Sequence, residues 1–264
     1  MSATVGSYLF LLLLALGVWR TALWRPRPLP GVTRPRPWAL GHRGARGPHA
    51  ENTMPAFAYA LRHGDGLETD VQRSFDGDLV LWHDFELAGV PVRDARTVWL
   101  RGQAPDLVTL ADLFRLAGEA PGTVLNLEIK SRPRPLRGWA LERDVVRAVR
   151  LSGLADRVLV SSFDPLALLR VRLLAPELRT GLLTAAEMPA LLRGGALAGW
   201  LHVDALHPEA PQVDAALLRT ARDRSLPLHV WTVNDPERMS ELVRKGVGAV
   251  IGDDPAAVAK HVKG

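Results

Sequence analysis

Short apolar runs alternate with longer segments of helical periodicity along most of the chain. The runs have the length of buried strands, and the segments between them have the spacing of amphipathic helices. Such alternation is typical of parallel βα units. We expect eight parallel strands, at residues 38–41, 66–71, 124–129, 157–160, 180–183, 202–205, 226–231 and 248–251. Eight such units in one domain predict an α/β protein with a TIM-type (βα)8 barrel.

One segment departs from this alternation after the second predicted strand. Asp76-Gly77 favours a tight hairpin turn, so residues 79–83 should run antiparallel to that strand. Residues 85–108 show no clear periodicity and predict an irregular loop. We therefore expect a small hairpin and loop excursion after the second strand. The helix between the first and second strands is predicted over residues 55–62, with Asn52 or Thr53 as its cap.

The first 24 residues have a different pattern. Residues 1–19 carry no charged side chain, and residues 8–19 are almost wholly large and apolar. This is just long enough to span a bilayer, so we expect an uncleaved transmembrane helix within residues 1–24. The alternative is a cleaved signal peptide and a secreted protein, but the basic n-region is missing. The arginines that follow predict a single-pass anchor with the barrel on the cytoplasmic side.

Residues 25–37 contain five prolines and four arginines, which predicts an extended tether, and the barrel domain should then cover residues 38–264. The net charge is +5 over 264 residues, and the arginines of the first 37 residues account for all of it. The barrel itself is formally neutral, so we do not expect nucleic-acid binding. The chain has no cysteine, which excludes disulfides, thiolate metal sites and a cysteine nucleophile.

Polar residues occur where the predicted strands end, which is where barrel enzymes carry their chemistry. In chain order these residues are His42 and Arg43, Glu68 and Asp70, His83 and Asp84, and Glu128 and Lys130. Glu68 and Asp70 are two residues apart and therefore point to one face of their strand. Because adjacent strands lie about 4.8 Å apart, Glu128 can approach them. Three converging carboxylates would repel one another unless they bind a cation, and oxygen ligands suit Mg²⁺ or Ca²⁺.

Taken in order, these residues resemble the glycerophosphodiester phosphodiesterases. The resemblance rests on His42-Arg43-Gly44, Glu51-Asn52-Thr53, Glu68-Thr69-Asp70-Val71, His83-Asp84, Glu128-Ile129-Lys130 and the strand ends at 160–165 and 230–234. It covers about residues 38–256. It implies a TIM-type barrel that requires a divalent cation. Such an enzyme hydrolyses glycerophosphodiesters, such as glycerophosphocholine or glycerophosphoethanolamine, to glycerol 3-phosphate and an alcohol.

The resemblance also implies a role for each site residue. Glu68, Asp70 and Glu128 would bind the metal ion. His42 and His83 would form the acid–base pair, with the acid and the base unassigned and the first attack made by water or by the glycerol hydroxyl. Arg43 and Lys130 would bind the phosphate, or else pair only with Glu51 and Glu128. Trp231 would stack on the glycerol or a quaternary head group, or else belong to the core. His49, His63, His202 and His207 are expected to be structural, and Asn52 to be a helix cap.

Two other functions fit part of the pattern. A membrane anchor would favour a lysophospholipase D that acts on lysolipids, and an apolar groove beside the site would support this reading. A catalytically dead, membrane-tethered binding module would lack a catalytic histidine or carboxylate, but none is missing. The sequence departs from the family pattern after Asp84 and at Gly252-Asp253-Asp254-Pro255. The first of these departures leaves the head-group preference open.

Overall fold

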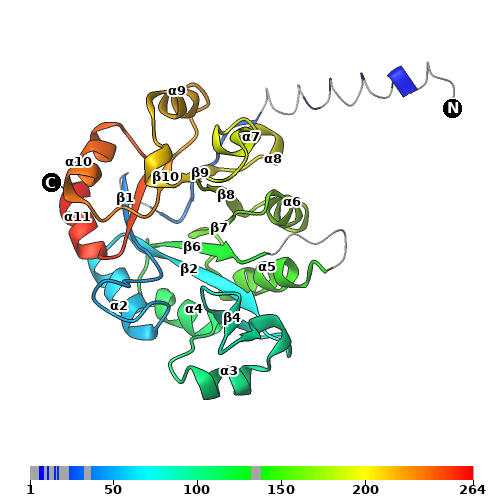
Figure 1. Ribbon diagram of the computed structural model, residues 1–264, viewed down its shortest axis with the longest axis vertical. Coiled ribbons are helices and arrows are strands. Elements are labelled where there is room, and N and C mark those ends of the chain that lie inside the picture. The colour runs from blue at the N-terminus through cyan, green and yellow to red at the C-terminus, as the bar shows by residue number, and fades with distance from the viewer. Residues whose placement is uncertain are drawn as a thin grey trace.

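The computed structural model describes residues 6–8, 11, 15, 17, 24–32, 37–131 and 138–263. The barrel strands are β1 (Trp38–Gly41), β2 (Gly66–Arg73), β6 (Val124–Ile129), β7 (Val158–Ser162), β8 (Arg179–Thr184), β9 (Ala205–Pro208), β10 (His229–Val230) and β11 (Ala249–Gly252). They are parallel, in the order β10-β11-β1-β2-β6-β7-β8-β9 (Figure 1). Two isolated parallel bridges join the β9 and β10 segments and nearly close the sheet. The predicted eight-stranded barrel is thereby confirmed.

Helices cover the outside of this barrel. They are α2 (Met54–His63), α4 (Leu110–Gly118), α5 (Ala140–Ser152), α6 (Pro165–Leu174), α7 (Ala190–Arg193), α8 (Ala198–Leu201), α9 (Ala215–Asp223), α10 (Pro236–Arg244) and α11 (Pro255–Lys263). Asp164, Asp214 and Asp235 precede α6, α9 and α10, and each accepts a hydrogen bond from an N–H of the first turn. Such caps satisfy N–H groups that have no partner inside the helix, so the aspartates mark where these helices begin.

Most of the predicted strands agree with the observed ones. Residues 38–41 and 124–129 coincide with β1 and β6, and five other predicted strands differ from the structure only at their ends. The strand predicted at 202–205 is wrong, because β9 begins only at Ala205. His202 ends α8 in the left-handed region, with φ of 54°. This conformation is outside the β region, so the chain turns at His202 before it enters the barrel.

The excursion after β2 contains more regular structure than its sequence predicts. Strand β3 (Leu79–Leu81) pairs antiparallel with β2, as expected from the Asp-Gly turn. Residues 85–108 were expected to be irregular, yet they form β4 (Glu86–Leu87), β5 (Val90–Pro91), a 3-10 helix (Val92–Asp94) and α3 (Thr97–Gln103). Val92 and Leu100 of this excursion are buried with Val80 in a separate small core. The elements are too short to show a period, and this core holds them in place.

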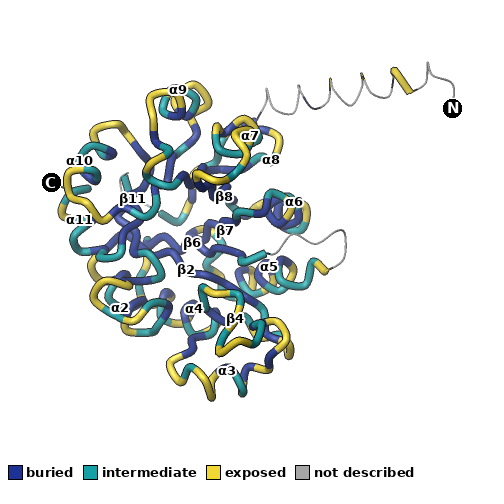
Figure 2. Tube along the Cα trace, in the orientation of Figure 1, coloured by how far each residue is buried: buried dark blue, intermediate teal, exposed yellow. Residues whose placement is uncertain are grey.

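The barrel strands are buried along nearly their whole length, and the helices lie around their outside (Figure 2). Parallel sheets covered in this way are normally apolar along their whole length. A charged residue in the middle of such a strand therefore needs a specific partner or a function.

Residues 25–32 of the predicted tether, together with Trp24 at the end of the predicted anchor, lie against the barrel instead. Leu29 is 5% exposed and packs among residues that begin several strands, including Trp38, Val124 and Ala249. The Arg27 side chain donates hydrogen bonds to both carboxylate oxygens of Asp204, which precedes β9. This segment closes the floor of the barrel, at the end opposite the carboxyl ends of the strands.

No helix within the described residues is long and apolar enough to cross a membrane. Most of the predicted anchor, residues 1–24, lies outside the described residues, and so do residues 33–36 of the predicted tether. The anchor stays a prediction.

Candidate active site

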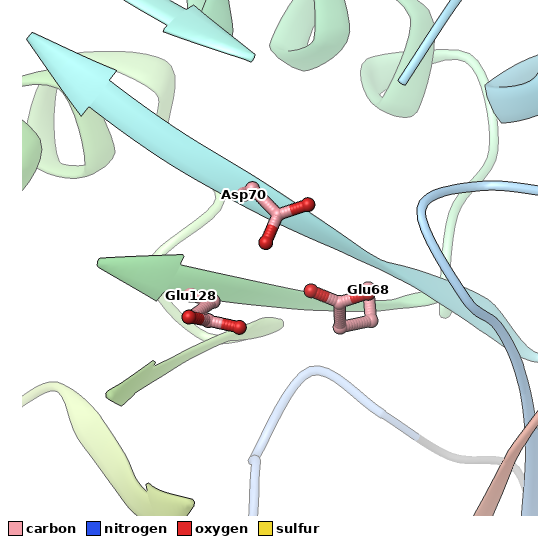
Figure 3. Close-up of side chains that lie close together, drawn as sticks. All are labelled: Glu68, Asp70 and Glu128. Atoms are coloured by element: carbon pink, nitrogen blue, oxygen red, sulfur yellow. The ribbon is translucent and has the colours of Figure 1, made fainter. Parts of the chain in front are cut away.

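Three carboxylates point into the barrel from two adjacent strands. Glu68 and Asp70 belong to β2, and Asp70 is level with Glu128 of β6 in the parallel register. Figure 3 shows the three side chains turned toward a common space. Ligand oxygens from all three lie within 4.8 Å of one another, and no residue of the three is more than 8% exposed. The structure thus brings together the carboxylates that the sequence places on neighbouring strand ends.

Burial and mutual repulsion destabilise the charged form of this cluster. Burial raises the pKa of Glu68 well above its ordinary value, and the charges of Asp70 and Glu128 raise it further. Burial and Asp70 also raise the pKa of Glu128 to about 7, although Lys130 acts in the opposite direction. A divalent cation would relieve this repulsion, and three carboxylate oxygens are ligands that Mg²⁺ and Ca²⁺ accept. The donor set therefore fits a resident metal ion.

Lys130, the residue after β6, partly neutralises the cluster. Its Nζ lies 3.0 Å from Glu128 Oε1 and 3.3 Å from Asp70 Oδ1. Burial alone would lower the pKa of Lys130, but Glu128 and Asp70 outweigh this effect and the pKa is raised. The ammonium group therefore stays charged beside the carboxylates. The ion pair with Glu128, the alternative to phosphate binding, is thus formed. Lys130 also lines the cavity into which the carboxylates point.

His42 follows β1 and is held by a residue that the sequence analysis does not assign to the site. Its Nδ1 lies 2.8 Å from Asp253 Oδ1, and Asn234 Nδ2 donates to Asp253 Oδ2 at 2.7 Å. Partial burial would raise the pKa of Asp253, but the hydrogen bonds from His42 and Asn234 outweigh it and the pKa is lowered. A carboxylate on one ring nitrogen orients the imidazole and leaves the other nitrogen available. Asp253 is therefore a positioning residue for His42.

The position of Asp253 at the end of the last predicted strand is a sequence signal for a site residue, but the sequence does not reveal its contact with His42. Asp253 follows the last barrel strand at the point where the chain departs from the family pattern. Strand β11 pairs with β1, so the ends of these two strands meet and Asp253 lies beside His42.

His83 lies in the loop after β3, the strand that pairs with the carboxyl end of β2. Its Nδ1 is 2.7 Å from Asp84 Oδ1. Burial lowers the pKa of His83, and Lys130 and Arg43 add to this effect, while Asp70 opposes it. Gln72 donates hydrogen bonds to the carbonyls of Trp82 and Asp84 and so fixes the backbone on both sides of the histidine. His83 is thus a neutral imidazole at pH 7 in a fixed loop.

Arg43 lies in a tight turn after β1. A Cβ on Gly41 would lie 1.7 Å from the carbonyl oxygen of Gly44, so only glycine fits at this turn. Arg43 Nη1 donates to both carboxylate oxygens of Glu51, at 2.8 and 2.9 Å. The Arg43–Glu51 ion pair, which the sequence offers as the alternative to phosphate binding, is therefore formed. The Arg43 Nε is nevertheless buried without a hydrogen-bond partner, and the residue lines the cavity.

Asn52 is not a helix cap, which corrects the interpretation of its sequence. The N-cap of α2 is Thr53. The buried Asn52 side chain instead donates from Nδ2 to Asp70 Oδ2 at 3.0 Å and accepts from the Thr69 hydroxyl at 2.7 Å. Its backbone is in the left-handed region, with φ of 55°, which asparagine tolerates better than most residues. Asn52 therefore orients one carboxylate of the cluster.

One cavity of about 130 Å³ at the mouth of the barrel brings the predicted residues together. Its lining includes His42, Arg43, Glu68, Asp70, His83, Glu128, Lys130 and Trp231, and it is completed by Phe163, Leu183 and Ile251. Trp231 packs edge to face against Phe163, with ring centroids 5.5 Å apart. Its Nε1 donates to the carbonyl of His207 at 2.7 Å. The indole thus forms a fixed apolar wall opposite the charged residues.

His207 lies below this cavity inside the barrel and is fully buried. Burial lowers its pKa to about 3, so the imidazole is neutral at pH 7. It does not line the cavity, which agrees with a structural role.

Comparisons with known proteins point to one family. Residues 42–99 and 91–257 match the model of the "Glycerophosphoryl diester phosphodiesterase family". A glycerophosphodiester phosphodiesterase from Caldanaerobacter subterraneus subsp. tengcongensis is 30% identical over 241 residues, which are 85% of this chain and 97% of that protein.

Solved structures show the same barrel. A glycerophosphodiester phosphodiesterase from Thermotoga maritima is 27% identical, with a TM-score of 0.68, over 86% of this chain and 99% of that chain. A phosphodiesterase from Oleispira antarctica was solved in complex with the product sn-glycerol-3-phosphate. It is 24% identical, with a TM-score of 0.68, over 85% of this chain and 96% of that chain, and this likeness shows the shared fold.

Proposed function

This chain belongs to the glycerophosphoryl diester phosphodiesterase family, and on that basis we propose that it hydrolyses glycerophosphodiesters to glycerol 3-phosphate and an alcohol. The observation that carries the proposal is the single cavity lined by three carboxylates, two histidines and two cations. Glycerophosphocholine and glycerophosphoethanolamine are the simplest substrates of this class. The Oleispira antarctica phosphodiesterase, which shares the fold, is described with the product that we propose here.

Glu68, Asp70 and Glu128 would hold one divalent cation, Mg²⁺ or Ca²⁺. When bound, such an ion polarises a phosphoryl oxygen and neutralises charge in the transition state. The raised pKa values of Glu68 and Glu128 support this assignment, because a buried carboxylate cluster of this kind needs positive charge. Asn52 and Lys130 hold Asp70 and Glu128 in place.

The two histidines would move the protons on opposite sides of the phosphate. Because the pKa of His83 is lowered, its neutral imidazole can accept a proton from the attacking hydroxyl. Asp253 holds the His42 ring through Nδ1, so the other ring nitrogen would be the one that donates a proton to the leaving oxygen. The attacking hydroxyl belongs to water or to the glycerol, and the second route passes through a cyclic phosphate. Phosphorus NMR during turnover distinguishes these routes, since the cyclic phosphate has its own resonance.

Arg43 and Lys130 would bind the non-bridging phosphate oxygens. The Arg43 side chain lines the cavity, and its Nε makes no hydrogen bond and lies 3.7 Å from Asp70 Oδ2. The wall formed by Phe163 and Trp231 would receive the glycerol carbons, because it is apolar and faces the charged residues across a small cavity.

The two alternative functions gain no support from the described residues. A lysophospholipase D would need a continuous apolar groove, whereas the larger cleft beside the catalytic cavity mixes apolar residues such as Phe85 and Leu141 with several charged side chains. A dead binding module would lack part of the catalytic set, but every predicted group lines the cavity.

The proposed function is tested by incubating the purified full-length chain with glycerophosphoethanolamine and Mg²⁺ or Ca²⁺. Glycerol 3-phosphate is measured with a coupled dehydrogenase assay. We expect release by the wild type and none by His42→Gln. Arg101→Gln, on the exposed surface of α3, is the matched control and should retain activity. No release by a folded wild-type chain with either metal ion would overturn the proposal.

We also propose that residues 1–24 anchor the chain in a membrane, with the barrel on the cytoplasmic side. The support is the uncharged apolar sequence and the arginines after it. Because residues 24–32 lie on the floor of the barrel, such an anchor would leave the domain at the end opposite the cavity. The mouth would then face water, which suits deacylated diesters better than lysolipids. Carbonate extraction of membranes tests the anchor: the full chain should stay with the membrane, and a chain beginning at residue 24 should not.

A further inference from the structure

A second cleft opens beside the catalytic cavity and is larger than it. This outer cleft has a volume of about 280 Å³, against about 130 Å³ for the catalytic cavity. It lies between the excursion after β2 and helices α5 and α6, and its lining includes Gln72, Arg73, Phe85, Arg93, Leu141 and Arg170. Lys130 lines both spaces, so the outer cleft lies directly beside the catalytic cavity.

The described lining of the outer cleft carries more positive than negative charge. Among the described residues it has four cationic side chains, Arg73, Arg93, Lys130 and Arg170, and two carboxylates, Asp94 and Glu142. Arg170 and Glu142 form a buried ion pair of 3.0 Å, so neither is available to a ligand. Arg73 is engaged by Asp144 at 2.7 Å, and Asp144 is not part of the lining.

Arg93 is the cation with the weakest partner among these four. It is 44% exposed, and its Nε lies 3.5 Å from the carboxylate of Asp94, its neighbour in sequence. A single long contact at an exposed position contributes little, so the guanidinium retains most of its capacity to bind an anion.

The structure holds Arg93 at the rim of this cleft. Arg93 lies in the short 3-10 helix between Val92 and Asp94. The neighbouring Val92 is 1% exposed, and its N–H donates to the carbonyl of Phe85 at 3.0 Å. The backbone that carries Arg93 is thus fixed to the same loop that carries Phe85. A fixed backbone lowers the entropy lost when the side chain binds a ligand.

The outer cleft is poorly suited to a quaternary ammonium group. Such groups bind in cages of several aromatic rings, and Phe85 is the single aromatic side chain in the lining formed by the described residues. The ring of Phe85 already faces a cation, because Lys130 Nζ lies 5.9 Å from its centroid. A second cation at this ring would meet the charges of Lys130, Arg73 and Arg93.

We propose that the outer cleft receives the alcohol portion of the diester, and that it favours an alcohol carrying a further anionic group, such as a second phosphate. This inference rests on the proposed function and names its substrate class. All glycerophosphodiesters share the glycerol, and its small size matches the cavity at the barrel mouth. The alcohol differs from one diester to another, and its larger size matches the outer cleft. Arg93 binds the additional anionic group at the rim.

Two substrates that differ only in one phosphate test this directly. Values of kcat/KM are measured for glycerophosphoinositol and glycerophosphoinositol 4-phosphate with the full-length chain and saturating Mg²⁺, and glycerophosphocholine serves as the cationic comparison. We expect the phosphorylated substrate to exceed glycerophosphoinositol by roughly fivefold to tenfold, which is the scale of one charge-assisted contact. We expect glycerophosphocholine to be the poorest of the three.

Variants assign the preference to Arg93. Arg93→Gln should remove the preference, so that the ratio of kcat/KM for the phosphorylated substrate to that for glycerophosphoinositol falls to about one. Circular dichroism and thermal unfolding like those of the wild type would show that the variant is folded. Arg93→Lys should keep part of the preference because it keeps the charge. Arg101→Gln removes the same charge from exposed α3, outside the lining, and should behave as the wild type.

The outcomes that overturn the inference differ from those that overturn the proposed function. Equal kcat/KM for the two inositol substrates, a preference for glycerophosphocholine, or equal losses in Arg93→Gln and Arg101→Gln would refute the anionic subsite while the phosphodiesterase activity stands. If the wild type cleaves none of the three substrates, the activity is refuted, and the inference with it.

Discussion

Leu29 closes the floor of the barrel, and its truncation should destabilise the whole domain. The side chain is 5% exposed and packs among residues that begin β1, β6, β9 and β11. A leucine truncated to alanine in a core costs about 2–5 kcal/mol. The neighbouring Pro28 and Pro30 are exposed, so water can enter part of the space, and we take the lower part of that range, about 2–3 kcal/mol.

Thermal unfolding of Leu29→Ala checks this value. For a domain of this size we expect the Tm to fall by roughly 5–10 °C. Leu151→Ala is the matched control, because Leu151 is 81% exposed on α5 and its truncation should change stability by less than about 0.5 kcal/mol. The same Tm for both variants would refute the packing of residues 24–32 on the barrel and restore the extended tether predicted from the sequence.

Three further predictions concern the site. Glu68→Ala should weaken metal binding and activity together, whereas His83→Ala should abolish turnover and largely keep metal binding; calorimetric titration with Mn²⁺ beside the activity assay separates the two. Asp253→Asn should lower kcat roughly 10–100-fold, because His42 loses the carboxylate that orients it, and steady-state kinetics at pH 7 measures this. Because the pKa of Glu128 is about 7 in the metal-free fold, against an ordinary 4.5, the fold binds a proton that the unfolded chain has released. The metal-free protein should therefore lose stability as the pH rises from about 4.5 to 7, and added Mg²⁺ should raise the Tm more at pH 8 than at pH 5, which thermal unfolding measures.

The strand ends could be predicted from the sequence because they depend on local rules. Alternation places Glu68 and Asp70 on one face, and the order of strands places Glu128 beside them. These relations need only the strand assignments and the barrel topology.

The contacts that the sequence does not reveal depend on closure of the barrel. Asp253 orients His42 across 211 residues of chain, and only the pairing of β11 with β1 brings them together. Asparagine favours both helix N-caps and left-handed backbone, so its sequence position alone suggests a cap. The left-handed backbone of Asn52 and its hydrogen bond to Asp70 show instead that it supports the carboxylate cluster. The arginine and proline content around Arg27 is typical of a tether, but composition cannot show that a buried Asp204 faces it.

Removal and restoration of the metal ion test the central claim most directly. The full-length chain is treated with EDTA, dialysed and then titrated with Mg²⁺, while glycerol 3-phosphate release from glycerophosphoethanolamine is followed. Release should stop in EDTA and return in the wild type on addition of Mg²⁺, but not in Glu128→Gln at the same concentration. Undiminished release in EDTA, or full restoration in Glu128→Gln, would contradict a catalytic metal ion held by Glu68, Asp70 and Glu128.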